Sequence, residues 1–515
     1  MKRQYLPIET LPVWAKLNNV IFNGVEVKHQ YSDDGSDKGS GVVVTSEKLI
    51  LDGEGTGDAE CDDARQPGVL ISVPPDLVLS LDLVETCAKS DRYLREVLEA
   101  VGEYGRTARG AILIFLLLHF TYSSQEIDER EGRQRIGVKH PWSEYIKFLP
   151  ASIYLPTFYN EEERELLHGT SLESALDAKM NSLEKEYGHL WESTQNIPWC
   201  QRDWWDEETG CLSFDDWKYV DAVYRSRALD LPGTGHAMVP CVDMANHASG
   251  DPTMALYDTD PQGNAALSLR DGKEKSLAVG GEITITYGDE KGAAEMIFSY
   301  GFLESDIEDA RQLFLDLDIP NDDPLKPAKK MFCDDAPGLR LFTKPGSNAT
   351  GWESDFVWWS CVNEEDGLDF SVVQSNDGKK ELLVTWKGEE IKSSERLKGL
   401  LSTDPLWDLF QLRAVVLVQG RIDSQYSEMR EVDEYVHHER TRSRNDESDS
   451  GHREEVLDAV VRLRKLEADL LQRGIADLEQ KKSELLNSEC VSAFLTAQST
   501  DTNAGSATAI AEDFS

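Results

Sequence analysis

Two short segments concentrate the polar and aromatic side chains that could take part in chemistry. The first, 239–250, reads VPCVDMANHASG and places an Asp, an Asn and a His behind a proline. The second, 280–304, contains a strand-like run, a glycine turn and a helical stretch with two tyrosines. Amide, imidazole and phenol groups can all pair with backbone groups or with a ligand. The two segments are therefore the first candidates for a functional site.

The two tyrosines of the second segment have two interpretations. Tyr287 follows the strand-like run and Tyr300 follows the helical stretch, so the chain can fold back and bring both phenols to one pocket. The simpler alternative is a buried strand after a turn, with Tyr300 as a core aromatic, because a buried Tyr usually needs only a partner for its hydroxyl. The residues by themselves leave both interpretations open.

The combination of the two segments resembles the SET-domain protein methyltransferases, in the branch typified by the plant RuBisCO large-subunit lysine methyltransferase. That family carries P-x-x-D-x-x-N-H, followed by G-E-x-x-I-x-Y-G and a Y-G-F element. The matching positions are Pro240, Asp243, Asn246, His247, Gly281, Glu282, Ile285, Tyr287, Gly288, Tyr300, Gly301 and Phe302. The helix between the last two motifs usually begins S/N-A-E, and Ala293 departs from this pattern.

The resemblance implies an α+β fold: a SET-domain β-fold with a pseudoknot and a helical insertion, followed by a mostly α-helical C-terminal domain. In the pseudoknot the two motif segments cross. The predicted boundaries are a SET domain at 13–304 with its insertion at about 85–232, a connection at 305–337, a helical substrate-binding domain at 338–497 with a disordered loop at about 437–455, and a disordered tail at 498–515.

A glycine-rich turn precedes a β-branched strand near the N-terminus. It reads Lys38-Gly39-Ser40-Gly41 before three valines, and such a pattern usually marks only a tight turn. The family has an x-G-x-G element here, whose backbone contacts S-adenosylmethionine. The resemblance therefore implies cofactor contacts at Lys38, Gly39 and Ser40, although Lys38 and Ser40 depart from the acidic and apolar residues often found there.

A predicted helix at 215–229 ends in Arg225-Ser226-Arg227. Basic residues in the last turn often do no more than interact favourably with the helix dipole. In the family the second arginine of this R-S-R element helps to hold the methionine carboxylate, which corresponds to Arg227. A guanidinium group suits that role because it can bind a carboxylate through two parallel hydrogen bonds.

The resemblance implies methyl transfer from S-adenosylmethionine to a protein nitrogen, with no metal. Tyr287 would align the methyl group and the attacking nitrogen, and Tyr300 would line the channel for that nitrogen. Asn246 and His247 would bind the cofactor, and Phe302 would pack against its adenine. Asp243 matches the motif, but we interpret it as structural.

Composition limits the classes of protein to consider. The chain has 515 residues, 40% of them hydrophobic, and a formal net charge of −42. This charge argues against direct nucleic-acid binding, because phosphates would be repelled. It favours a basic protein partner, unless the acidity serves only solubility. The longest apolar run, 111–120, is too short to span a membrane, and eight cysteines without paired spacing are typical of reduced thiols.

Three functions fit these observations. The first is a protein-lysine methyltransferase acting on a non-histone protein, such as a ribosomal or translation protein. The second is a protein-histidine methyltransferase with the same fold. The third is a catalytically silent SET-fold binding protein, because a fold does not guarantee an activity. We expect a monomer in the cytoplasm, with access to the nucleus.

Overall fold

The computed structural model describes residues 1–31, 37–52, 68–124, 136–274, 277–333, 338–374, 380–444 and 452–496. The chain divides into two compact units. Unit 1 comprises Met1–Phe158, Leu176–Glu290 and Phe298–Glu304, and unit 2 comprises Tyr159–Ala175, Lys291–Ile297 and Ser305–Ser515. Both are mixed α and β. Among the described helices, none is long and apolar enough to cross a membrane.

Unit 1 is built around short antiparallel strands in three sheets. The sheet orders are β1-β4-β8-β7, β2-β3-β9 and β5-β6. The strands are β1 (Ile21–Phe22), β2 (Val25–Tyr31), β3 (Asp37–Val44), β4 (Val69–Val73), β5 (Ala228–Leu231), β6 (Gly235–Met238), β7 (Ala255–Thr259), β8 (Ala265–Leu269) and β9 (Glu282–Ile283). The pairing of β3 with β9 places the glycine-rich strand beside the second motif segment.

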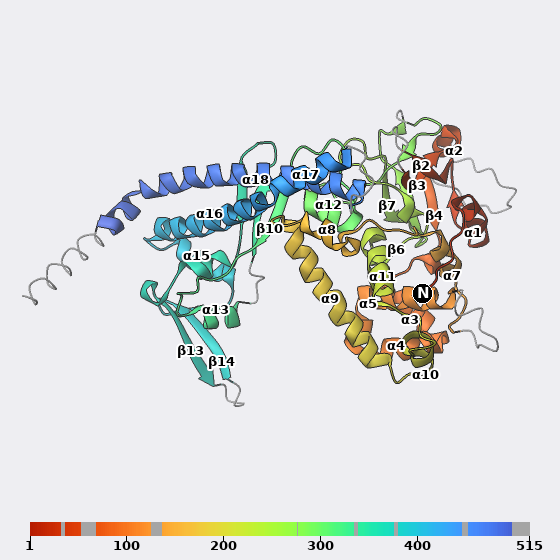
Figure 1. Cartoon of the computed structure of the whole chain (residues 1–515), viewed down its shortest axis with the longest axis horizontal. Coiled ribbons are helices and arrows are strands. Elements are labelled where there is room, and N and C mark those ends of the chain that lie inside the picture. Colours follow the sequence, from red (N-terminus) through yellow and green to blue (C-terminus); the bar gives the residue numbers. More distant parts are fainter. Residues whose placement is uncertain are drawn as a thin grey trace, which may run out of the picture. The chain divides into compact units, whose positions relative to one another are not determined.

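Helices fill the chain between β4 and β5, as the predicted helical insertion requires (Figure 1). The helices before β10 are α1 (Leu11–Leu17), α2 (Glu47–Asp52), α3 (Leu81–Ser90), α4 (Arg92–Ala100), α5 (Ala108–Tyr122), α7 (Pro141–Tyr145), α8 (Glu161–Glu165), α9 (Ser171–Thr194), α10 (Pro198–Cys200), α11 (Phe214–Arg227) and α12 (Ala293–Tyr300). α5 contains the apolar run 111–120 and is buried from Gly110 to Thr121. It is capped by the Thr107 hydroxyl, which accepts the Gly110 N–H at 3.0 Å.

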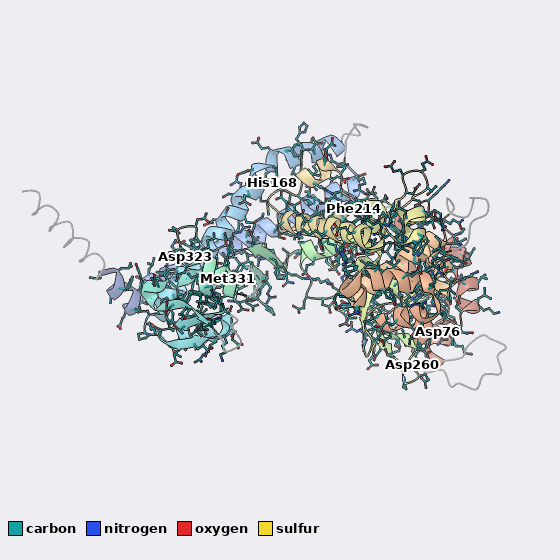
Figure 2. The ribbon with its side chains drawn as sticks, turned by 90° about the horizontal axis from the view of Figure 1, so that it is seen from below. Asp76, His168, Phe214, Asp260, Asp323 and Met331 are labelled. Carbon is teal, nitrogen blue, oxygen red and sulfur yellow. The ribbon has the colours of Figure 1, made fainter. Side chains whose placement is uncertain are left out.

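α11 carries the predicted R-S-R element at its C-terminal end. Phe214, labelled in Figure 2, is its first residue. The helix starts in a capping box, in which the Ser213 side chain accepts the Asp216 N–H and the Asp216 side chain accepts the Ser213 N–H. Arg227 is the last residue of α11, and β5 begins at the next residue. The position of the Arg227 side chain is therefore set by the junction between the helix and the strand.

Unit 2 contains two three-stranded antiparallel sheets, ordered β10-β11-β12 and β13-β14-β15, with helices. Its elements are β10 (Gln312–Asp316), β11 (Gly338–Thr343), β12 (Thr350–Glu353), β13 (Leu368–Gln374), β14 (Lys380–Trp386), β15 (Glu389–Ile391), α13 (Lys326–Phe332), α14 (Val357–Cys361), α15 (Ser394–Ser402), α16 (Trp407–Glu431), α17 (Asp433–Arg444) and α18 (Glu454–Leu486). The long helices α16 and α18 pack side by side (Figure 1).

Two sequence-based expectations for this half are wrong. The predicted connection at 305–337 holds β10 and α13, and β10 pairs along its whole length with β11. Leu313 and Leu315 are buried while Phe314 is exposed, the alternation of a half-buried strand. Asp323, labelled in Figure 2, forms an ion pair with the buried Lys329.

The loop predicted at about 437–455 is largely helical where it is described. α17 continues to Arg444 and α18 starts at Glu454, while 445–451 and the tail at 498–515 lie outside the described residues. Acidic residues in the first turn of α17, Asp433 and Glu434, favour a helix in this polar sequence.

One buried acid of unit 2 should make stability depend on pH. Glu467 of α18 accepts the Ser171 N–H at 2.9 Å and the Ser171 hydroxyl, and burial raises the pKa of Glu467 to about 7. A raised carboxyl pKa favours the protonated form in the folded state. The resulting stability is complete below the unfolded pKa of about 4.3 and is lost as pH rises through 7.

Glu467→Gln should therefore raise the free energy of unfolding at pH 8 relative to the wild type, on the order of 2–3 kcal/mol, with little difference near pH 4. The amide oxygen can still accept the Ser171 N–H. Chemical denaturation at both pH values measures the effect, with the exposed Glu484→Gln as control. Equal slopes of stability against pH in wild type and Glu467→Gln would contradict it.

Candidate active site

The two motif segments lie side by side in unit 1. The N–H of Ile285 donates to Asn246 O at 2.9 Å, and the N–H of Ala248 donates to Ile285 O at 3.0 Å. His247 and Ile285 form the corresponding parallel bridge. The backbone thus joins the N-H motif to the strand that leads to Tyr287, as the expected crossing requires.

Tyr287 is held at three points. Its hydroxyl donates to Ala245 O at 2.9 Å, and its backbone N–H donates to His247 Nδ1 at 3.0 Å. Its ring stacks on the His247 ring, with centroids 5.0 Å apart and planes 18° apart. Burial raises the pKa of Tyr287 well above its ordinary value, so the phenol stays neutral across the physiological range.

Tyr300 and Phe302 complete an aromatic group around these residues. The Tyr300 ring lies 4.4 Å from that of Tyr287. The Tyr300 hydroxyl points to Tyr287 O at 3.5 Å, a long and weak hydrogen bond. The Phe302 ring lies 6.3 Å from the His247 ring, and the residue is 37% exposed, so part of this aromatic residue remains accessible beside the buried stack.

The Asn246 side chain lies close to the glycine-rich strand. We refer to the close contacts of Gly41 with Asn246 and Glu282 as the Gly41 cradle. Asn246 Nδ2 donates to Glu282 Oε1 at 2.7 Å. A Cβ at Gly41 would lie 2.7 Å from Glu282 Oε1 and 3.0 Å from Asn246 Nδ2, so a larger residue here would have to displace these side chains. Gly39 and Ser40 precede Gly41 in β3, opposite Gln30 and His29. The expected cofactor contact at Lys38 is one of the backbone, and its side chain lies outside the described side chains.

Arg227 is anchored by a buried acid. Its Nη1 donates to Asp243 O at 2.9 Å and lies 3.7 Å from Asp243 Oδ2. The Tyr145 hydroxyl donates to Asp243 Oδ1 and accepts the Cys241 N–H at 2.8 Å. Burial raises the pKa of Asp243, while the Arg227 charge opposes this shift. Asp243 thus contacts both Arg227 and Tyr145 from a buried position.

This geometry has counterparts among known proteins. A crystal structure of the SET domain of LSMT, bound to methyl-lysine and AdoHcy, superposes with a TM-score of 0.57 at 19% identity, over 94% of each chain. SET domain-containing protein 8 of Schizosaccharomyces pombe is 29% identical over 360 residues, which cover 69% of this chain and 75% of that protein. In sequence and fold the chain is similar to SET-domain proteins of the RuBisCO large-subunit methyltransferase-like branch. No protein-family model matches it.

Two further relatives differ in the amino acid that their names specify. The actin-histidine N-methyltransferase of Danio rerio is 22% identical over 263 residues, covering 50% of this chain and 39% of that protein. The fructose-bisphosphate aldolase-lysine N-methyltransferase of Arabidopsis thaliana is 27% identical over 196 residues, covering 37% and 39%. The matched region thus spans about two fifths of the length of these two relatives.

The structure brings together most of the site residues predicted from the sequence. Tyr287, Tyr300, His247 and Phe302 form one aromatic group, and Asn246 joins it through the backbone of Ile285. Four residues that our sequence interpretation did not assign to the site also contribute: Gly41, Tyr145, Glu282 and Glu304. Glu282 and Gly41 belong to the G-E-x-x-I-x-Y-G and x-G-x-G motifs. Tyr145 lies in the helical insertion, where no local sequence pattern indicates a contact with Asp243.

The cradle at Gly41 gives a test of the cofactor region. Gly41→Ala should force Glu282 and Asn246 apart and weaken S-adenosylmethionine binding about tenfold, since overpacking costs about 1–3 kcal/mol. Calorimetric titration measures the change. Gly188→Ala is the matched control, because nothing lies within 4 Å of a Cβ placed at this α9 position. Unchanged affinity in Gly41→Ala would show that the cradle does not shape the binding site.

Unit 2 contains a separate groove of about 900 Å³. Three tryptophans form one side of it: the Trp358 ring lies 6.3 Å from Trp352 and 5.1 Å from Trp407. Lys398 Nζ lies 5.7 Å from the Trp358 ring. Among the described residues that line the groove, none belongs to the two motif segments. The motif segments of unit 1 therefore remain the candidate site for the chemistry.

Proposed function

We propose that this protein transfers a methyl group from S-adenosylmethionine to a lysine side chain of a non-histone protein. The observation that carries the proposal is the position of Tyr287. Its neutral hydroxyl is fixed on Ala245 O, while its ring packs against those of His247 and Tyr300. A rigid, uncharged phenol of this kind can align two reacting groups without exchanging a proton with them.

The residues present fit S-adenosylmethionine. Arg227, whose guanidinium is fixed on Asp243, would bind the carboxylate of the cofactor's methionine part. Asn246 and the backbone of Gly39 and Ser40, next to the Gly41 cradle, would hold its polar groups. The partly exposed Phe302 would pack against the adenine. The π faces of Tyr287 and Tyr300 suit a sulfonium cation.

The bound cofactor supplies a methyl group that its sulfonium centre already makes electrophilic. The protein must present a neutral amine, and a lysine at its ordinary pKa of about 10.4 is charged at neutral pH. Burial in this site and the positive charge of the sulfonium favour the neutral form, because desolvation and a nearby cation both lower the pKa of an ammonium group. The Tyr287 hydroxyl and the Ala245 carbonyl then set the direction of approach.

Histidine methylation is the second candidate, and the similarity to the actin-histidine N-methyltransferase of Danio rerio favours it. An imidazole is already largely neutral at pH 7, so it does not require the same loss of a proton. We favour lysine because the fructose-bisphosphate aldolase-lysine N-methyltransferase of Arabidopsis thaliana matches with a higher identity, 27% against 22%.

We further propose a basic protein substrate, such as a ribosomal or translation protein, and a monomeric enzyme located in the cytoplasm with access to the nucleus. The net charge of −42 supports a basic substrate, because opposite charge accelerates encounter and like charge discourages nucleic acid. Rates of methylation that fall steeply with added salt would support this attraction.

Transfer of radiolabelled methyl groups tests the proposed function. The protein is incubated with labelled S-adenosylmethionine and a methylation-depleted lysate of the source organism, and the proteins are separated. We expect at least one labelled protein band that is absent without the enzyme. Cofactor binding without any labelled protein, across lysates from several growth conditions, would instead support the silent SET-fold protein.

A further inference from the structure

Glu304 follows the Tyr300-Gly301-Phe302 element and contacts the far side of His247. Its Oε1 lies 3.0 Å from His247 Nε2. The same oxygen accepts the backbone N–H of Ser249 at 3.0 Å. The His247 side chain is fully buried and that of Glu304 is 12% exposed, so the contact is largely shielded from water. Hydrogen bonds to a carboxylate are stronger than neutral ones.

The contacts define which nitrogen of His247 carries the proton. Nδ1 faces the backbone N–H of Tyr287, which can only donate, so Nδ1 must be the acceptor. A neutral imidazole then carries its proton on Nε2. The Nε2–H faces Glu304 Oε1, and the Ser249 hydroxyl lies 3.2 Å from the same nitrogen. An ionised carboxylate can only accept, so Glu304 stabilises this tautomer.

The tautomer of His247 affects Tyr287, because His247 Nδ1 accepts the backbone N–H of Tyr287 and the two rings stack on each other. A proton on Nδ1 would place two donors against each other and release the Tyr287 backbone. We infer that Glu304 is a positioning residue that fixes the Nε2–H tautomer of His247 and thereby keeps Tyr287 in the geometry for methyl transfer. The catalytic part of this inference rests on the proposed function.

Two variants separate positioning from general stability. Glu304→Ala removes the acceptor for both donors, whereas Glu304→Gln keeps an oxygen that can accept them. We expect Glu304→Ala to lower kcat about 100-fold, since small misplacements of reacting groups have effects of this size, with KM for S-adenosylmethionine changed less than about threefold. Glu304→Gln should recover at least about a third of the wild-type kcat. The exposed Glu308→Ala is the control.

A spectroscopic measurement tests the tautomer without any activity. In protein labelled with ¹⁵N-histidine, the His247 signals are those lost in His247→Gln. We expect an unprotonated Nδ1 in the wild type and in Glu304→Gln, and a mixture of tautomers in Glu304→Ala. A protonated Nδ1 in the wild type would overturn the inference, and so would a Glu304→Ala variant with unchanged kcat. A wild-type protein that transfers no methyl group would refute the proposed function. The ¹⁵N signals would then still test whether Glu304 fixes the tautomer of His247.

Discussion

Tyr287→Phe is expected to lower methyl transfer at least about 100-fold while the protein remains folded and binds S-adenosylmethionine. The substitution removes one oxygen, whose hydrogen bond to Ala245 O at 2.9 Å fixes the phenol. The ring contacts with His247 and Tyr300 remain possible, so packing should be preserved. Removing a single preorganised donor from an active site typically costs a factor of 100 to 1,000 in rate.

Tyr300→Phe is the matched comparison. Its hydroxyl makes only a 3.5 Å contact with Tyr287 O, so its loss should lower the rate less than about tenfold. Rates from labelled S-adenosylmethionine, together with calorimetric affinities, separate transfer from binding. Equal rate losses in the two variants, or a Tyr287→Phe variant as active as wild type, would remove Tyr287 from the central role given to it here.

Arg227→Ala is expected to have two separable effects. It should weaken S-adenosylmethionine binding by about 10- to 100-fold, because hydrogen bonds to charged groups contribute about 1.5–3 kcal/mol. It should also destabilise the protein by about 3 kcal/mol, because Asp243 would remain as a buried carboxylate without its cation. Calorimetric titration and chemical denaturation measure the two effects.

Two further variants distinguish these effects. Arg227→Lys keeps a cation near Asp243 but not the planar, bidentate geometry, so it should recover stability more than affinity. Arg227→Ala combined with Asp243→Asn removes both charges, and should recover much of the lost stability while cofactor binding stays weak. If Arg227→Ala bound the cofactor like the wild type, the carboxylate of S-adenosylmethionine would have to be held elsewhere.

The aromatic part of the site could be predicted because its residues lie in short motifs. The bridge between His247 and Ile285 joins positions far apart in the chain, and the family resemblance implied that these two segments meet. The supporting residues could not be predicted in this way. Tyr145 and Asp243 are 98 positions apart, and nothing in the polar pattern of either segment specifies their hydrogen bond.

The fold of unit 1 was predicted from the family resemblance, and the apolar run at 111–120 lies in the buried helix α5. Errors arose where polar composition hid regular structure. The acidic stretch around β10 reads as a linker, yet Leu313 and Leu315 bury one face of a paired strand. α17 is similarly polar, and its buried contacts, such as those of Val436, depend on packing that no local pattern specifies.

Lysine methylation is tested most directly by identifying the labelled amino acid. A substrate band labelled by the wild-type protein is hydrolysed in acid, and the radioactive amino acid is compared with methylated lysine and methylated histidine standards. We predict that the label co-migrates with methyl-lysine and that Tyr287→Phe removes it. Label in methyl-histidine would contradict the lysine assignment and identify this chain as a histidine methyltransferase of the same fold.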